Sequence, residues 1–174
     1  MAETSSYPFG AAGRAYGAFA RMAENIIPYW LIALAARLGV GMVFWKSGQT
    51  KLIGDFEIAP AIYLQFQNEF FPNWNEGLVD GMVVLTTVME NVCGLLLMVG
   101  VLTRLNALAL LGMTAVIQFL VWTDWSKLAD FANPFQAWDT HLFWAAALLL
   151  IIARGPGAVS VDHVVGRLFG RRQG

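Results

Sequence analysis

An apolar run from Tyr29 to Trp45 constrains this chain most, because it carries one charged side chain, Arg37, near its centre. With its flanks the run is long enough for a tilted helix across a bilayer, which needs about 20 mostly apolar residues. A guanidinium at the centre of such a helix costs about 2.5–3.5 kcal/mol on insertion scales unless another segment or water offers it an acceptor. Glu90, inside a second apolar segment, is the acceptor that the sequence offers. We therefore predict a buried ion pair between Arg37 and Glu90.

Composition places the whole chain among membrane proteins. Of its 174 residues, 57% are hydrophobic and 13% are charged, whereas soluble domains have about 25% charged residues. The net charge of -1 gives no indication of nucleic-acid binding. One cysteine, Cys93, and two histidines cannot form a His/Cys metal cage or a C-x-x-C redox pair within one chain, so we expect no metal or haem site.

Four apolar segments predict an all-α fold, namely an integral membrane four-helix bundle in which residues 1–174 form a single domain. The first 27 residues carry apolar side chains at a spacing of three to four, with arginines on another face. This pattern predicts an amphipathic helix in the membrane interface. Residues 154–174 form a basic tail. The spans are expected at residues 29–47, 78–99, 103–122 and 135–153.

The segment from Asp55 to Asp80, expected on the outer side of the membrane, is acidic and aromatic. A stripe at helical spacing runs through it, is broken near Pro60 and is stopped by Pro72, which predicts a short interfacial helix. A lid over a substrate site is the alternative interpretation. The stripe consists of Phe56, Ala59, Tyr63, Phe66 and Phe70.

The distribution of basic residues predicts the orientation of the chain. Cytoplasmic loops of membrane proteins carry an excess of Lys and Arg. With the N-terminus in the cytoplasm, seven basic residues lie inside and only Lys46, Lys51 and Lys127 lie outside. We therefore expect a multi-pass protein with both termini in the cytoplasm. The seven inner residues are Arg14, Arg21, Arg104, Arg154, Arg167, Arg171 and Arg172.

Depth along the helices places the polar side chains at two levels. At about 1.5 Å per residue, Arg37 and Glu90 both lie about 14–15 Å from the inner ends of their spans, which are marked by Pro28 and Gly100. A second level, at about 20–22 Å, predicts a polar pocket that opens outward. Its candidate members are Lys46, Lys51, Thr86, Gln118, Trp122 and His141.

Each polar group leaves a structural and a functional interpretation open, and no catalytic residue can be assigned. The pair of Arg37 and Glu90 fixes the register between the first two spans, or it is linked to proton or ligand binding. His141 and Gln118 form an interhelical hydrogen bond without chemistry, or they hold a quinone head group, because a histidine donates to a carbonyl and titrates near neutral pH. The two lysines after the first span extend toward the surface, or they line the pocket.

The order and spacing of these residues resemble the DoxX family over roughly Ile32 to Asp162, which is most of the chain. The resemblance is carried by GVGMVFWKSGQTKL after the first-span arginine, by TTVMENVCGLLLMVGVLTRLNALALLGMTAVIQ around Glu90, and by the closing HLFWAAALLLIIARGPGAVSVD. It implies a four-helix bundle in the bacterial inner membrane. It also implies a redox setting, because the related DoxD proteins look like the membrane subunit of thiosulfate:quinone oxidoreductase. The matching positions are Arg37, Lys51, Glu90, Arg104, Gly155, Pro156, Gly157 and Asp162.

These observations favour a membrane subunit of a quinone-linked redox system, connected by the resemblance with sulfur or oxidative stress. Such a subunit binds a quinone head group or docks a soluble or membrane redox partner. The sequence shows no electron carrier, so the chain is not expected to be catalytic alone. A non-catalytic membrane scaffold or stress-response assembly protein is the alternative. A third interpretation is an exporter of small molecules or metal ions that acts as a homo-oligomer. All three place the chain in a lipid bilayer.

Overall fold

The computed structural model describes residues 10–121 and 138–170, which are mostly helical. The helices of this part of the chain are linked by tight turns, a two-stranded hairpin and an extended loop. In chain order the elements are α1 (Gly10–Ile26), α2 (Tyr29–Thr50), β1 (Leu52–Ile53), β2 (Glu57–Ile58), α3 (Pro60–Gln65), the π-helical turn η1 (Phe66–Phe70), α4 (Glu76–Val99), α5 (Thr103–Val116), the π-helical turn η2 (Ile117–Val121), α7 (Trp138–Arg154) and α8 (Val161–Gly170).

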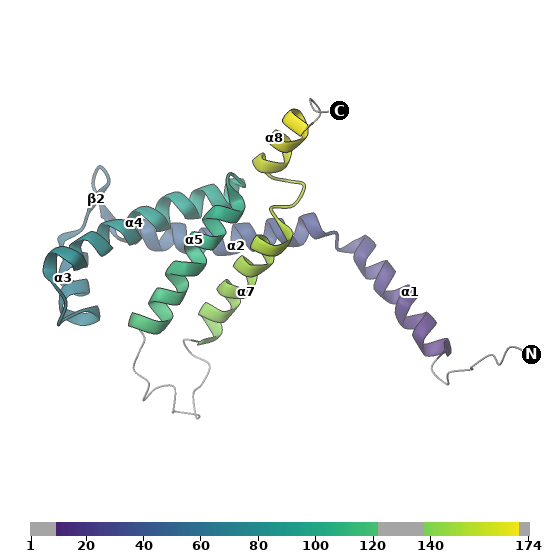
Figure 1. The fold of residues 1–174 in the computed structure, drawn as a ribbon, viewed down its shortest axis with the longest axis horizontal. Helices are drawn as coiled ribbons and strands as arrows, with labels where there is room; N and C mark the ends of the chain where they lie inside the picture. The colour runs from purple at the N-terminus through teal and green to yellow at the C-terminus, as the bar shows by residue number, and fades with distance from the viewer. Residues whose placement is uncertain (1–9, 122–137, 171–174) are drawn as a thin grey trace, which may run out of the picture.

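Four apolar helices form two antiparallel pairs (Figure 1). Helices α2 and α4 lie side by side, and α5 and α7 form a second pair that runs at an angle to the first. We call the end where α2 begins and α7 ends the basic end, because Arg104 and Arg154 lie there. The opposite end, which carries the β1–β2 hairpin, is the hairpin end. Helices α1 and α8 extend away from the pairs (Figure 1).

Local sequence accounts for where α4 begins and ends. The Asn75 side chain accepts a hydrogen bond from Leu78 N at 3.2 Å, which caps the first turn. Gly100 ends the helix in the left-handed conformation, at φ 83°. By length and composition α2 and α4 could each cross a membrane, and two shorter apolar helical stretches are Thr103–Phe119, from α5 into η2, and His141–Arg154, in α7. The helices overlap the four predicted spans, and their crossing of a bilayer stays a prediction of the sequence.

Glycine allows α2 and α4 to approach closely. A Cβ atom on Gly94 would lie 2.9 Å from the backbone nitrogen of Trp45 and 3.0 Å from the carbonyl oxygen of Gly41. Real Cβ atoms do not make such contacts with backbone, so one helix would have to move. Small residues at helix interfaces are typical of membrane proteins, where packing and not the hydrophobic effect drives helix association.

The apolar core lies where the four helices meet, and a smaller cluster lies under the segment between α2 and α4. The main cluster draws on α2, α4, α5 and α7, and the smaller one on η1, the residue after it and α4. The buried members of the main cluster are Val40, Phe44, Leu97, Ala107, Leu110, Met113, Leu148 and Ile151. Those of the smaller cluster are Phe66, Phe71, Val79 and Val83.

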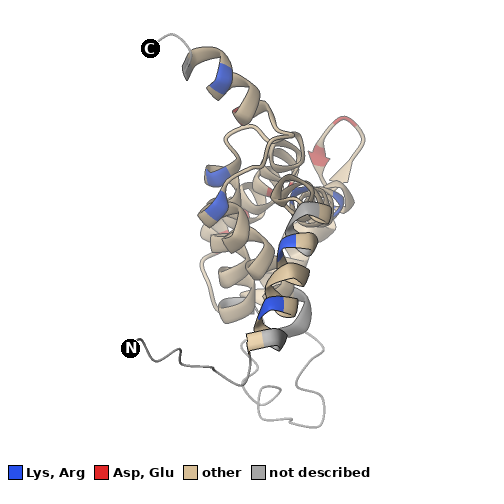
Figure 2. Ribbon diagram, turned by 90° about the vertical axis from the view of Figure 1, so that its right-hand side faces the viewer, with Lys and Arg blue, Asp and Glu red and all other residues tan. Residues whose placement is uncertain are grey.

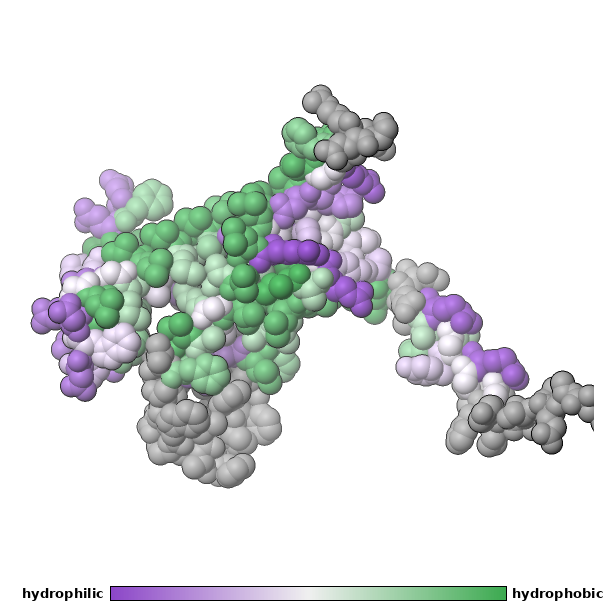
Figure 3. Space-filling model, in the orientation of Figure 1, coloured by the Kyte–Doolittle hydropathy of each residue, from purple (hydrophilic) through white to green (hydrophobic). Residues whose placement is uncertain are grey.

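Most of the apolar surface of these helices faces outward. Only 33% of the residues in the most apolar part of α2, and 28% in that of α4, are buried. Figure 3 shows this exposed apolar surface, the hydrophobic belt, over the helix pairs on the face in view, with hydrophilic residues gathered toward their ends. Soluble proteins rarely expose an apolar patch of this extent, so the belt suits contact with lipid. Representative belt residues are Leu38, Leu85, Val92, Leu105, Leu108 and Leu149.

The predicted interfacial helix after the first span is wrong in its first part. Residues 52–58 form an antiparallel hairpin in which Leu52 pairs with Ile58, and Phe56 lies near its tip at φ 71° with 84% of its surface exposed. Pro60 begins helix α3 and does not break it, because a proline at the first helical position sacrifices no intrahelical hydrogen bond. Figure 2 shows acidic positions on the hairpin and basic positions on α1 and α8.

We predict that Gly94→Ala destabilises the pairing of α2 and α4 by about 1–3 kcal/mol, as overpacking of a tight interface does. Gly112→Ala is the matched control, because a Cβ atom on Gly112 meets nothing within 4 Å. Alanine favours a helix over glycine by about 1 kcal/mol, so this control should hold or raise stability. Thermal unfolding in detergent measures both variants. Equal melting temperatures for the two would contradict the close-packing argument.

Candidate functional site

A buried carboxylate lies between α2 and α4 toward the hairpin end. The Lys51 ammonium lies 2.8 Å from Glu90 Oε2 and forms an ion pair with it, without the geometry of a directional hydrogen bond. The Lys51 and Glu90 side chains are 14% and 4% exposed. Ser47 Oγ donates to the other carboxylate oxygen at 3.1 Å. The Lys51 ammonium also lies 5.6 Å from the centre of the Phe66 ring. Glu90 therefore has a cation and a hydroxyl as partners, and the cation also lies beside a ring of η1.

The predicted ion pair between Arg37 and Glu90 is wrong. Arg37 is buried, at 1% exposure, but it donates through Nη2 to the carbonyl oxygen of Val159 in the loop before α8. Its Nε and Nη1 atoms have no hydrogen-bond partner among the described residues. The carboxylate of Asp162 is close enough to interact with the guanidinium electrostatically. The two predicted partners are each buried, and each is paired elsewhere.

The relative shift of the two helices explains the error. Gly41 lies opposite Gly94 and Met98, and Gly48 lies opposite Asn91. This antiparallel register brings Arg37 to the level of Gly100, about ten residues and so about 15 Å along α4 from Glu90. The depth estimate assumed that Pro28 and Gly100 mark the same level. Instead the first turns of α2 extend past the α4–α5 turn and pack against the loop around Gly157.

The loop after α7 and the first turn of α8 are held at the basic end by several hydrogen bonds. Asp162 accepts from the backbone nitrogens of Leu102 and Thr103, each at 2.8 Å, and from the Thr103 hydroxyl at 2.6 Å. It thereby caps the start of α5, where backbone N–H groups lack helical partners. The Asp162 nitrogen donates to Gly100 O at 2.9 Å, and the Tyr29 hydroxyl donates to Gly155 O at 2.7 Å. We call the hydrogen bonds of Asp162 with Gly100, Leu102 and Thr103, together with that of Tyr29 with Gly155, the clasp.

Burial alone would raise the pKa of Asp162, but the clasp outweighs it. The hydrogen bonds from Thr103 and Leu102, together with the positive charge of Arg37, lower the pKa of this carboxyl below its ordinary value. Asp162 is therefore a structural anion at neutral pH. Gly100 is needed beside it, because a Cβ atom there would collide with the Arg37 guanidinium and lie 2.7 Å from Ser160 Cβ.

A cavity of about 250 Å³ lies between α5 and α7. Gln118 and His141 both line it, and Gln118 Oε1 lies 2.6 Å from His141 Nδ1. The His141 ring packs against Trp144, with ring centres 5.1 Å apart. The rest of the lining is almost wholly apolar and includes Phe119 and Leu142, which are exposed on the outer surface of the helices. The cavity thus combines one imidazole and one amide with walls suited to an apolar ring.

The structure divides the predicted pocket. It brings Gln118 and His141 together, whereas Lys51 pairs with Glu90 and does not line the cavity. Thr86 hydrogen-bonds to Val83 O within its own helix. Lys46 is exposed on α2 and is not part of the cavity lining. The remaining member, Trp122, lies outside the described residues.

Sequence reasoning missed two residues that hold the polar groups in place. Ser47 lies one helical turn before Lys51, so the two share a face, and this spacing was a signal for a common partner. Asp162 entered only through the family resemblance, and nothing in its local sequence pointed to the start of α5. Within the described residues no group of three or more His, Cys, Asp or Glu side chains could hold a metal ion.

A comparison with known families gives one match. The sequence model of the DoxX family matches residues 32–123, which include the buried Arg37 and the pair of Lys51 with Glu90. No curated protein matches the chain, and neither does any solved structure. The matched segment includes most of α2 and all of α4 and α5, and it ends before α7 and the loop that follows α7.

We predict that Lys51→Met lowers the free energy of unfolding by about 3 kcal/mol or more, because it leaves the Glu90 carboxylate buried without its cation. Lys46→Met removes the same charge from an exposed position and should change stability little. The Lys51→Met/Glu90→Leu double variant removes both charges and should recover much of the loss. Denaturation in detergent measures all three. A similar small effect of both single substitutions would contradict the buried pair.

We predict that the clasp weakens in acid. Because the pKa of Asp162 is lower in the folded chain than the value of about 3.9 in an unfolded one, the stabilisation is complete above about pH 5 and is lost as the pH falls through the lowered value. Asp162→Asn should melt at a lower temperature at neutral pH and show a shallower decline below pH 4 than the parent. Melting curves from pH 7 to pH 3 measure this. Parallel declines would show that Asp162 does not contribute.

Proposed function

Because the chain belongs to the DoxX family of membrane proteins, we propose that it is the membrane subunit of a quinone-linked redox system. In this proposal α2, α4, α5 and α7 form a four-helix bundle across the bacterial inner membrane, and both termini lie in the cytoplasm. The exposed apolar belt supports the membrane location, and the arginines at the basic end support the orientation. The redox role depends on the cavity between α5 and α7.

The hydrogen-bonded pair of Gln118 and His141 at that cavity is the observation that carries the proposal. The cavity volume of about 250 Å³ is below the ~300–1,000 Å³ typical of drug-sized ligand sites. Such a space suits a single ring and not a whole lipid. Phe119 and Leu142 are exposed beside it, so an isoprenoid tail could leave along the lipid-facing surface. The residues therefore fit a quinone head group.

The chemistry of the two polar side chains suits carbonyl recognition. A bound quinone would accept two electrons and two protons. An imidazole can donate a hydrogen bond to a carbonyl and can exchange a proton near neutral pH. The Gln118 contact at Nδ1 orients the His141 ring, as a partner on one ring nitrogen generally does. The sequence has one cysteine and so no dithiol pair, and in this proposal a partner protein supplies the electrons.

The hairpin supports a second candidate function, a scaffold that docks another protein. Phe56 is 84% exposed near the tip of the hairpin, between the exposed acidic residues Asp55 and Glu57. Exposed aromatic residues are enriched where proteins bind one another. This surface is compatible with the redox proposal, since the electron donor has to dock somewhere. A stoichiometric protein partner without bound quinone would favour the scaffold alone.

We predict that the chain purified in mild detergent retains added ubiquinone or menaquinone, and that His141→Ala and Gln118→Ala each reduce retention by about tenfold, as loss of a buried hydrogen bond does. Gln65→Ala is the matched control, because among the described residues the Gln65 side chain bonds only to Glu69, which lies on the same surface segment. Solvent extraction followed by chromatography measures the quinone. Melting curves verify that the variants are folded. Equal retention by all four proteins, or none by the parent, would refute the site.

A further inference from the structure

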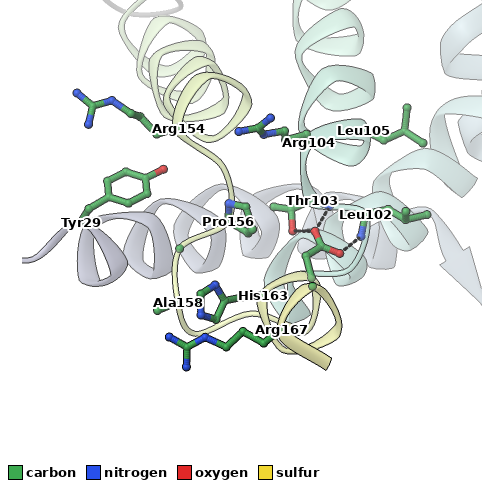
Figure 4. Close-up of a pocket in the computed structure, with 13 residues that line it drawn as sticks. Tyr29, Leu102, Thr103, Arg104, Leu105, Arg154, Pro156, Ala158, His163 and Arg167 are labelled. Atoms are coloured by element: carbon green, nitrogen blue, oxygen red, sulfur yellow. Dashed lines mark hydrogen bonds between the residues drawn. The ribbon is translucent and has the colours of Figure 1, made fainter. Parts of the chain in front are cut away.

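A second and larger cavity lies at the basic end, away from the predicted pocket. Its volume is about 780 Å³, and it lies between the start of α5, the end of α7 and the start of α8. Figure 4 shows Arg104 and Arg154 on one side of the loop after α7, and His163 and Arg167 on the other. Tyr29 of α2 also lines the cavity (Figure 4).

The cavity carries excess positive charge. Arg104, Arg154 and Arg167 line it, and none of them has an ion pair or hydrogen bond among residues 10–121 and 138–170. The single carboxylate of the lining, Asp162, has both oxygens occupied by the clasp, and so it is not positioned as their partner. Guanidinium groups recognise phosphate oxygens through paired hydrogen bonds. An anion with phosphate chemistry therefore suits this space.

The surroundings of the cavity are apolar. Leu102 and Leu105 line it and are 59% and 62% exposed, in continuity with the hydrophobic belt. Helix α8 beside it is amphipathic and leaves Leu168 and Phe169 exposed at 65% and 64%. A free phosphate would gain nothing from these side chains, whereas the acyl chains of a lipid would cover them. Basic pockets at membrane-helix ends are known sites for anionic lipid head groups.

We propose that this cavity binds the phosphodiester head group of an anionic phospholipid, with Arg104 and Arg154 on the phosphate and the acyl chains along Leu102 and Leu105. The site is separate from the α5–α7 cavity and does not depend on the quinone proposal. A lipid bound at this site would contact α5, α7 and the loop after α7 together. A bound lipid would therefore stabilise the packing of the loop that also holds Arg37.

Native mass spectrometry of the full chain in detergent tests the proposal. Phosphatidylglycerol and phosphatidylcholine with identical acyl chains are titrated in parallel, and inorganic phosphate is added in a third series. We expect phosphatidylglycerol to bind at least about tenfold more tightly than phosphatidylcholine and to raise the melting temperature, since each basic residue near an anionic head group adds to the attraction. Equal binding of the two lipids by the unaltered chain would overturn the proposal.

Variants locate the site. Arg104→Gln/Arg154→Gln should abolish the preference for phosphatidylglycerol, whereas Arg21→Gln, which removes a charge from the exposed helix α1, should retain it. Retention of the full preference by the Arg104→Gln/Arg154→Gln chain would overturn the proposal, as would binding of inorganic phosphate that displaces the lipid and confers the same stabilisation. The lipid comparison on the unaltered chain stays decisive if the double variant fails to fold.

Discussion

A charged group inside an apolar layer must find a partner, and this requirement organises the structure. In the part of the chain that the structure describes, the apolar helices bury two charged side chains, Arg37 and Glu90, and the two have different partners. Glu90 takes the ammonium of Lys51 from the chain just beyond α2 and a hydroxyl from Ser47. Arg37 takes a backbone carbonyl from the loop that follows α7. Each ion therefore ties α2 to a segment that is not its neighbour in sequence.

The partners of these two buried ions lie at opposite ends of the helix pairs, and they tie different segments together. At the hairpin end, the ion pair connects α4 to the residue where α2 gives way to β1, close to Phe66 of η1. At the basic end, Arg37 joins α2 to the loop before α8 through the carbonyl of Val159, and the Asp162 bonds of the clasp join the start of α8 to the α4–α5 turn. Removal of Glu90 would leave the Lys51 ammonium without its anion, and removal of Asp162 would leave the start of α5 without its cap. Either loss costs more than the loss of a surface contact.

Prediction from the sequence succeeded for the helices, which follow from local periodicity, and gave mixed results for contacts between helices, which were estimated from depth along the spans. The helices α2, α4, α5 and α7 overlap the four apolar segments, and the contact of Gln118 with His141 is present. The ion pair of Arg37 with Glu90 is absent, because the register of α2 against α4 is set by contacts of Gly41, Gly48 and Gly94. No residue count from the helix ends contains that information. The hairpin was missed because its strands have two residues each.

The sequence by itself determined that the chain is helical and apolar, that it carries ionic side chains within its apolar helices, and that it belongs to the DoxX family. The first two properties follow from composition and from the 3.6-residue period, which are local, whereas membership of the family rests on the match of its sequence model to residues 32–123. Only the tertiary structure decided which ion meets which partner, that Asp162 caps α5, and that three arginines surround one cavity. Those pairings depend on how the helices are placed along one another, and for the two buried ions the register of α2 against α4 is set by close packing at Gly41, Gly48 and Gly94.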